Sequence, residues 1–192
     1  MFPGDDIARL LPEHLKSFAA DLKKYPEGYP SWLYGALQNA VYQGDILRSI
    51  KVVGVDEDGD AVSRDGPVVV ISHTCDCQQG LSEFILVAPV FSIQERIEGS
   101  ELTPQQVDNY LRDLRANRIT ELLFLPGVGA LPDSFVDFSQ VCAIASAYFH
   151  SAAFLSSDHR VISLSQKGHY FFLMKMSYHF CRSDPKDSTR QS

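Results

Sequence analysis

The sequence predicts a single α+β domain, in which a small, strongly bent β-sheet or barrel is flanked by helices. The prediction rests on the runs Pro67–Ser72 and Phe84–Val90, because short, β-branched and almost wholly apolar segments are typical of central, buried strands. Residues 43–90 offer only turns between strands, which argues against a doubly wound α/β fold. Apolar strands need closure or cover to hide their edges, which favours a bent sheet or a barrel.

The first forty residues are predicted to be a helical extension of this domain. Leu15, Phe18 and Leu22 recur at helical spacing, and a second, shorter helix is expected at 32–40. From Gln43 the period changes, and residues 46–55 are predicted to form a strand that ends in an acidic turn at 56–59. A loop over 63–66 then leads into the first apolar run.

The clearest helix signal lies at 103–116, inserted between strands of the predicted barrel at 43–147. Thr103 is expected to be the N-cap, Pro104 occupies the first helical position, and Gln106 completes a capping box. This helix is therefore predicted to begin sharply.

The later elements follow the same logic. Residues 119–125 and 135–147 are predicted to be strands separated by Gly- and Pro-rich turns. A C-terminal helix is expected within 160–182, capped by Ser163 or Ser165, and the polar tail 183–192 should be frayed.

Composition narrows the class of protein. The 192 residues carry a net charge of −7, which argues against a protein that coats DNA, since duplex binding usually rests on a basic surface. Four cysteines are too few for a disulfide scaffold, and the first residues lack the pattern of a signal peptide. We therefore expect a cytoplasmic protein with reduced thiols and no transmembrane helix.

Three short segments resemble the MazF/PemK family of toxin endoribonucleases. They are Gly44-Asp45-Ile46, then Pro67–Ser72, then Ile85–Ser92, and the likeness extends over about 43–147. The resemblance implies an SH3-like barrel and metal-independent cleavage of single-stranded RNA with no cofactor. It also implies a homodimer and an antitoxin partner in a bacterial cytoplasm.

The chain departs from the family pattern at two places. The family commonly has an arginine directly before the proline of the valine run, whereas Gly66 stands here and Arg64 lies two residues earlier. The polar pair after the Ala-Pro-Val strand is represented by Phe91 and Ser92, so one hydroxyl of two is kept.

The densest chemical cluster is the segment from His73 to Cys77 (HTCDC), directly after a predicted buried strand. One interpretation is a plain turn capped by Asp76 with cysteines packed as small hydrophobes. Another is a metal site of His73, Cys75 and Cys77, completed by residues of the last helix such as His179 and Cys181. A third makes Cys75 a nucleophile activated by His73.

We favour a fourth interpretation, in which His73 and Asp76 line a groove and act as general acid and base or as ligand contacts. Cleavage through the 2′-hydroxyl of RNA needs a base, an acid and a cation for the charge that develops on the phosphate. His73 or Asp76 would be the base, Arg64 the cation, and Ser92 a hydrogen-bond donor. Asp45, at a strand entry, is expected to serve a turn.

The last helix offers a possible binding stripe for nucleic acid or another ligand. Lys175, His179 and Arg182 fall at i, i+4 and i+7. They form the one polar face of a helix that is otherwise apolar on nearly all sides. The alternative function is therefore a catalytically inactive barrel that binds nucleic acid or a protein.

Overall fold

The computed structural model describes residues 33–37, 39–155 and 158–181. Most of the predicted N-terminal extension, Arg182 and the tail 183–192 lie outside the described residues. Within them the chain is an α+β protein, as the sequence predicted. Its elements in chain order are β1 (Tyr34–Gly35), β2 (Ile46–Val55), β3 (Ala61–Val70), β4 (Phe84–Ser92), α3 (Ile93–Glu98), α4 (Pro104–Arg115), β5 (Leu122–Leu125), β6 (Ser134–Asp137), the 3₁₀ turn η1 (Phe138–Gln140), β7 (Cys142–Ala145), α5 (Ser146–Phe149), α6 (Ala152–Leu155), β8 (Arg160–Leu164) and α7 (Gln166–Cys181).

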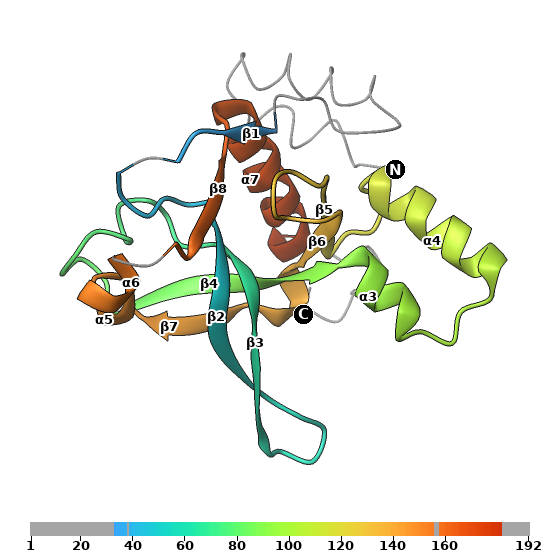
Figure 1. Ribbon diagram of the computed structural model, residues 1–192, viewed down its shortest axis with the longest axis horizontal. Coiled ribbons are helices and arrows are strands. Elements are labelled where there is room, and N and C mark those ends of the chain that lie inside the picture. The colour runs from blue at the N-terminus through green and yellow to red at the C-terminus, as the bar shows by residue number, and fades with distance from the viewer. Residues whose placement is uncertain (1–32, 38, 156–157, 182–192) are drawn as a thin grey trace, which may run out of the picture.

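The eight described strands form one antiparallel sheet in the order β1-β8-β2-β3-β4-β6-β5, with β7 also paired to β4. The order places β1 at one end and β5 at the other, so the sheet is not closed into a barrel. The predicted closed barrel is therefore not found. Cover, rather than closure, hides the apolar strands, because helices and short strands pack on both faces of the sheet (Figure 1).

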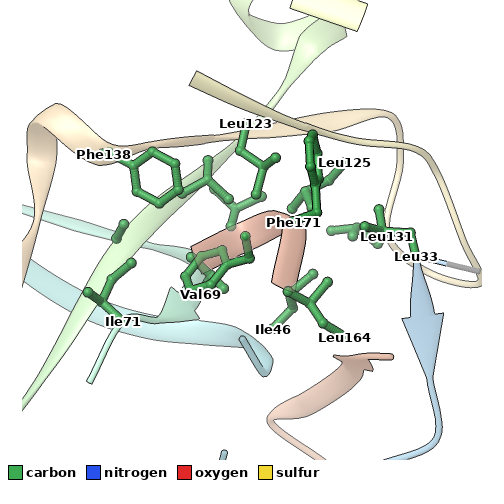
Figure 2. Packing of buried hydrophobic residues seen from close by; sticks show 14 residues of the cluster. Leu33, Ile46, Val69, Ile71, Leu123, Leu125, Leu131, Phe138, Leu164 and Phe171 are labelled. Carbon is green, nitrogen blue, oxygen red and sulfur yellow. The ribbon is translucent and has the colours of Figure 1, made fainter. Parts of the chain in front are cut away.

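The centre of the sheet is buried on both faces because successive side chains of a strand point to opposite sides. One side of β2, β3 and β4 packs against α7, β5 and β6, and Figure 2 shows this cluster, with Val69 and Ile46 facing Phe171 and Leu123. The other side packs against Phe149 and Phe154 of α5 and α6. The near-continuous apolar runs in the sequence reflect this double burial.

Strands β2 and β3 continue beyond the body of the sheet as a long two-stranded ribbon (Figure 1). We call residues 51–65 the outer arm. Inside the body β2 pairs with β8 only at Ile46 and Leu47, and β3 pairs with β4 only at Val68–Val70. A register shift between Leu47 and Ile50, where Ser49 has a φ of 55°, marks the place where the ribbon leaves the sheet.

Several predicted elements agree with the structure. The strand predicted at 46–55 is β2, and the predicted helix at 103–116 is α4 with its capping box between Thr103 and Gln106. Ser165 caps α7, since its Oγ accepts a hydrogen bond from the Gly168 N–H at 3.1 Å. Strong local signals of this kind depend little on the rest of the fold.

Other boundaries were wrong for identifiable reasons. The loop predicted at 63–66 belongs to β3, whose polar outer half pairs with β2. The single strand predicted at 135–147 is interrupted by η1, because Asp137 Oδ1 accepts from the Ser139 N–H and caps a 3₁₀ turn. Residues 160–164, predicted as the start of the last helix, form β8.

The helix predicted at 32–40 is also contradicted where the structure describes it. Tyr34 and Gly35 form β1, which pairs with Leu164 and Ser163 of β8.

Among the described residues, none of the helices is long and apolar enough to cross a membrane.

Candidate active site

The site is organised by a tight turn that leads into β2. The Asp45 N–H donates to the Tyr42 carbonyl at 3.0 Å, and Gly44 has a φ of +87°, as the third residue of a type II turn requires. A Cβ at Gly44 would lie 2.9 Å from Cδ1 of Leu164, so a larger residue here would push that side chain aside as well as strain the backbone. The turn fixes Gln43 at its outer corner.

Asp45 anchors this turn to β8. Its carboxylate is buried and accepts from Ser163 Oγ at 2.6 Å, from Arg160 Nη2 at 3.1 Å and from the Tyr42 N–H at 3.1 Å. A buried carboxylate is tolerated when an opposite charge and hydrogen bonds satisfy its oxygens. Asp45 thus has the turn-supporting role expected from the sequence.

The His73–Cys77 segment forms a compact turn between β3 and β4. The N–H groups of Asp76 and Cys77 donate to the His73 carbonyl at 2.8 and 3.3 Å, and Nδ1 of His73 accepts from the Cys75 N–H at 3.2 Å. The His73, Cys75 and Asp76 side chains are exposed. The imidazole of His73 is therefore held by its own turn with Nε2 left as its other polar atom.

Cys77 takes no part in this exposed group. It is buried, its Sγ lies 3.8 Å from the Ser72 carbonyl, and burial, aided by the charge of Asp76, raises the pKa of its thiol to about 11. The described residues contain no group of three or more His, Cys, Asp or Glu side chains placed to hold a metal ion. Among them, the alternative site of His73, Cys75 and Cys77 is not assembled.

Gln43 joins the turn before β2, the loop after β3 and helix α7. Its side chain is buried; Nε2 donates to the Ile71 carbonyl at 2.6 Å, and Oε1 lies 3.0 Å from Nε2 of His169. Its backbone N–H donates to Thr74 Oγ1 at 3.3 Å. Three segments far apart in sequence therefore meet at one buried amide.

His169 brings a second imidazole to the His73 loop. It is half-buried in the first turn of α7, and its pKa is lowered by burial first and then by the charge of His73. Gln43 links the two segments, because its side chain contacts His169 and its backbone N–H donates to Thr74, the residue after His73. The site thus combines a half-buried imidazole that favours the neutral form with an exposed imidazole on the neighbouring loop.

Arg64 and Ser92 lie together at the other end of β4. The Arg64 guanidinium donates from Nη2 to the Val90 carbonyl at 2.7 Å and stands 4.0 Å above the Phe91 ring, a cation–π contact. It also covers Gly66, where a Cβ would lie 3.1 Å from Arg64 Nη2. Burial lowers the pKa of Arg64. Ser92 caps α3, with Oγ accepting from the Glu95 N–H at 3.4 Å.

The four predicted catalytic residues therefore form two separate pairs. The Ser72 N–H, next to His73, bonds to Leu86 of β4, and Ser92 is six residues further along that strand. At roughly 3.3 Å per residue this is about 20 Å. His73 and Asp76 lie at one end of β4, and Arg64 and Ser92 lie at the other.

Lys175, which was predicted to be part of a basic stripe on the surface of the last helix, does not lie on the surface. Lys175 is buried, and its Nζ donates to the Asn117 and Ile119 carbonyls at 2.9 and 2.5 Å. Burial lowers its pKa to about 8. His179 is half-buried beside Phe138, with ring centroids 6.0 Å apart, and Arg182 lies outside the described residues.

Gln43 and His169 escaped the sequence analysis because no local pattern links them. They are 126 residues apart, and His169 is one of several aromatic and apolar residues of α7. The available signal was the Gln-Gly-Asp turn at 43–45, which requires a fixed corner residue at position 43.

No family model matches the chain, and no curated protein is found to be related to it.

Proposed function

We propose that the protein is a metal-independent ribonuclease that cleaves single-stranded RNA at the site formed by His73 and His169. The observation that carries this proposal is that Gln43 contacts both His169 and Thr74, the residue after His73. One half-buried and one exposed imidazole are thereby brought to the same place. A pair of titratable groups whose surroundings differ is the arrangement that acid and base catalysis requires. We also propose, from the resemblance to the MazF/PemK family, that the protein has an antitoxin partner, forms a homodimer and is located in the cytoplasm.

The chemistry follows from the two imidazoles. One ring removes the proton of the 2′-hydroxyl, the 2′-oxygen attacks phosphorus, and the bond from phosphorus to the 5′-oxygen breaks. The other ring, as imidazolium, gives its proton to that 5′-oxygen, so the products are a 2′,3′-cyclic phosphate and a 5′-hydroxyl.

The distribution of charge supports an RNA substrate despite the net charge of −7. The acidic turn of Asp56, Glu57, Asp58 and Asp60 lies at the tip of the outer arm, where Asp56 Oδ1 accepts from two backbone N–H groups. The ten residues of β3 from Ala61 to Val70 span about 30 Å. These carboxylates are thus carried away from the imidazole pair, where they would repel phosphate.

The test is a cleavage assay with the purified full chain, a labelled single-stranded RNA and excess EDTA. We expect cleavage that leaves a cyclic phosphate and that falls by about 10²–10⁴-fold in His73→Ala and in His169→Ala. Cys75→Ser in the same turn is the matched control and should cleave like the wild type. Intact RNA with the wild-type protein, or full activity in both histidine variants, would refute the proposal.

A second candidate is a binding module without catalysis, favoured by the outer arm. Val53, Val55 and Val62 are 59%, 71% and 47% exposed on a ribbon that pairs with no other described strand. Open strand edges with apolar side chains are typical of surfaces that pair with another chain. Binding of labelled RNA or of an added strand at the arm, without cleavage, would favour this function over the nuclease.

A further inference from the structure

The buried amide of Gln43 constrains which nitrogen of His169 holds a proton. A backbone carbonyl only accepts hydrogen bonds, so the group of Gln43 that lies 2.6 Å from the Ile71 carbonyl must be the NH₂. The other end of the amide is then the oxygen, which also only accepts. That oxygen lies 3.0 Å from Nε2 of His169, and the contact is a hydrogen bond when Nε2 carries the proton.

We infer that Gln43 is a positioning residue that holds His169 as the tautomer with the proton on Nε2, so that Nδ1 of His169 is the proton acceptor of the site. In a neutral imidazole one nitrogen carries the proton and the other has the free electron pair. Fixing the proton on Nε2 therefore places the electron pair on Nδ1. This inference rests on the proposed function for the identity of the proton, which comes from the 2′-hydroxyl.

The same reasoning assigns the complementary role to His73. Nδ1 of His73 accepts from the Cys75 N–H at 3.2 Å, so in the neutral ring the proton lies on Nε2. In its neutral form His73 therefore presents an N–H where His169 presents a bare nitrogen. The imidazole pair is asymmetric, with His169 as the base. His73 is the acid once it has taken up a second proton on Nδ1, in place of the hydrogen bond from the Cys75 N–H, and it then gives its Nε2 proton to the leaving oxygen.

The position of Gln43 is well supported by its neighbours. The type II turn with Gly44 holds the backbone of Gln43, and the Gln43 N–H donates to Thr74 Oγ1. Asp45 in turn anchors this turn to β8. A side chain held at both its donor and its acceptor has little freedom to rotate. Such orienting hydrogen bonds behind a functional histidine are commonly required for full function.

The experiment is a ¹⁵N NMR measurement of the histidine rings in the full-length protein at neutral pH. The expected wild-type result is a protonated Nε2 and a bare Nδ1 for His169, whatever the protein does to RNA. A protonated Nδ1 with a bare Nε2 would overturn the inference even if RNA is cleaved. A protein that shows the expected tautomer but leaves RNA intact would instead refute the proposed function.

The matched variant is Gln43→Met, which keeps the length of the side chain and removes both hydrogen bonds. His169 should then lose its single tautomer signature, and kcat for RNA should fall by about tenfold or more with little change in KM. Gln78→Met, at an exposed position of the His73 loop, should alter neither the tautomer signature nor kcat. An unchanged His169 signature in folded Gln43→Met would overturn the inference, and if this variant does not fold, the wild-type spectrum alone decides.

Discussion

The inner and outer halves of β3 have the same secondary structure but differ in burial and in strand pairing. Val68–Val70 lie between β2 and β4 and are buried on both faces, whereas Ala61–Gly66 pair only with β2 and are largely exposed. The inner half leads directly into the His73 turn, and the outer half carries Arg64 and ends at the acidic turn. An extended strand places residues that are close in sequence far apart in space. The four residues predicted as catalytic are therefore divided between the two ends of β3.

The largest effect that sharpens this contrast concerns buried charge. We expect Asp45→Ala to destabilise the protein by about 3–5 kcal/mol, because it removes a fully buried carboxylate together with three hydrogen bonds. The donors of those bonds are the Ser163 hydroxyl, the Tyr42 N–H and the Arg160 guanidinium. Asp65→Ala, an exposed acid on the outer arm, should change the free energy of unfolding by about 0.5 kcal/mol or less. Urea unfolding of both variants measures the difference, and equal losses would show that the arm is as tightly integrated as the inner sheet.

The next effect comes from the same isosteric change made once inside the body of the sheet and once on the outer arm. Val69→Thr buries a hydroxyl among apolar side chains and should cost about 1–3 kcal/mol. Val53→Thr, on the exposed outer arm, should stay within about 0.5 kcal/mol. A cost at Val53 that matches that at Val69, again from urea midpoints, would mean that the arm is covered in solution.

Two glycines with the same backbone angle provide a third comparison. Gly44 and Gly59 both have a φ of +87°, but a Cβ at Gly44 meets Leu164 and a Cβ at Gly59 meets nothing within 4 Å. Gly59→Ala should therefore cost only the conformational penalty, about 1 kcal/mol, and Gly44→Ala about 1–2 kcal/mol more. Thermal unfolding of the pair checks this, and a smaller loss at Gly44 than at Gly59 would contradict the tight turn described for the site.

The smallest expected effect is a dependence of stability on pH that originates at His169 of α7, beside the inner end of β3. The lowered pKa of His169 means that the unfolded chain takes up a proton at its ordinary value of 6.5 before the folded protein does. Stability is then lost as the pH falls through 6.5 towards the lowered pKa. Unfolding at pH 8 and at pH 5.5 should show a larger loss for the wild type than for His169→Gln, and identical losses would contradict it.

The parts of the fold that the sequence predicted are those with local causes. The capping box of α4, the apolar run of β3 and the span of β2 depend on neighbours within a few residues. The elements that were missed depend on distant partners: β8 is a strand because it pairs with β1 and β2 and because Ser163 and Arg160 meet Asp45. Tertiary contacts of this kind overrode the helical tendency assigned to 160–164.

The candidate site shows the same division. His73 was found because imidazole, thiols and a carboxylate crowd one turn, which is a local signal. Gln43 and His169 are identified only by the hydrogen bond between them, across 126 residues. Lys175 was misplaced because helical spacing shows which residues share a face but not that two carbonyls of another segment lie against it.

The contact between Arg64 and Gly66 has a consequence for how this strand can vary among relatives. The two residues lie on one side of β3, two positions apart, and the guanidinium of the first fills the space above the second. A side chain at position 66 would therefore have to displace the guanidinium. We expect them to covary, with a large residue at 66 accompanied by a small one at 64, so that the arginine changes its place in the sequence while its charge stays near Phe91.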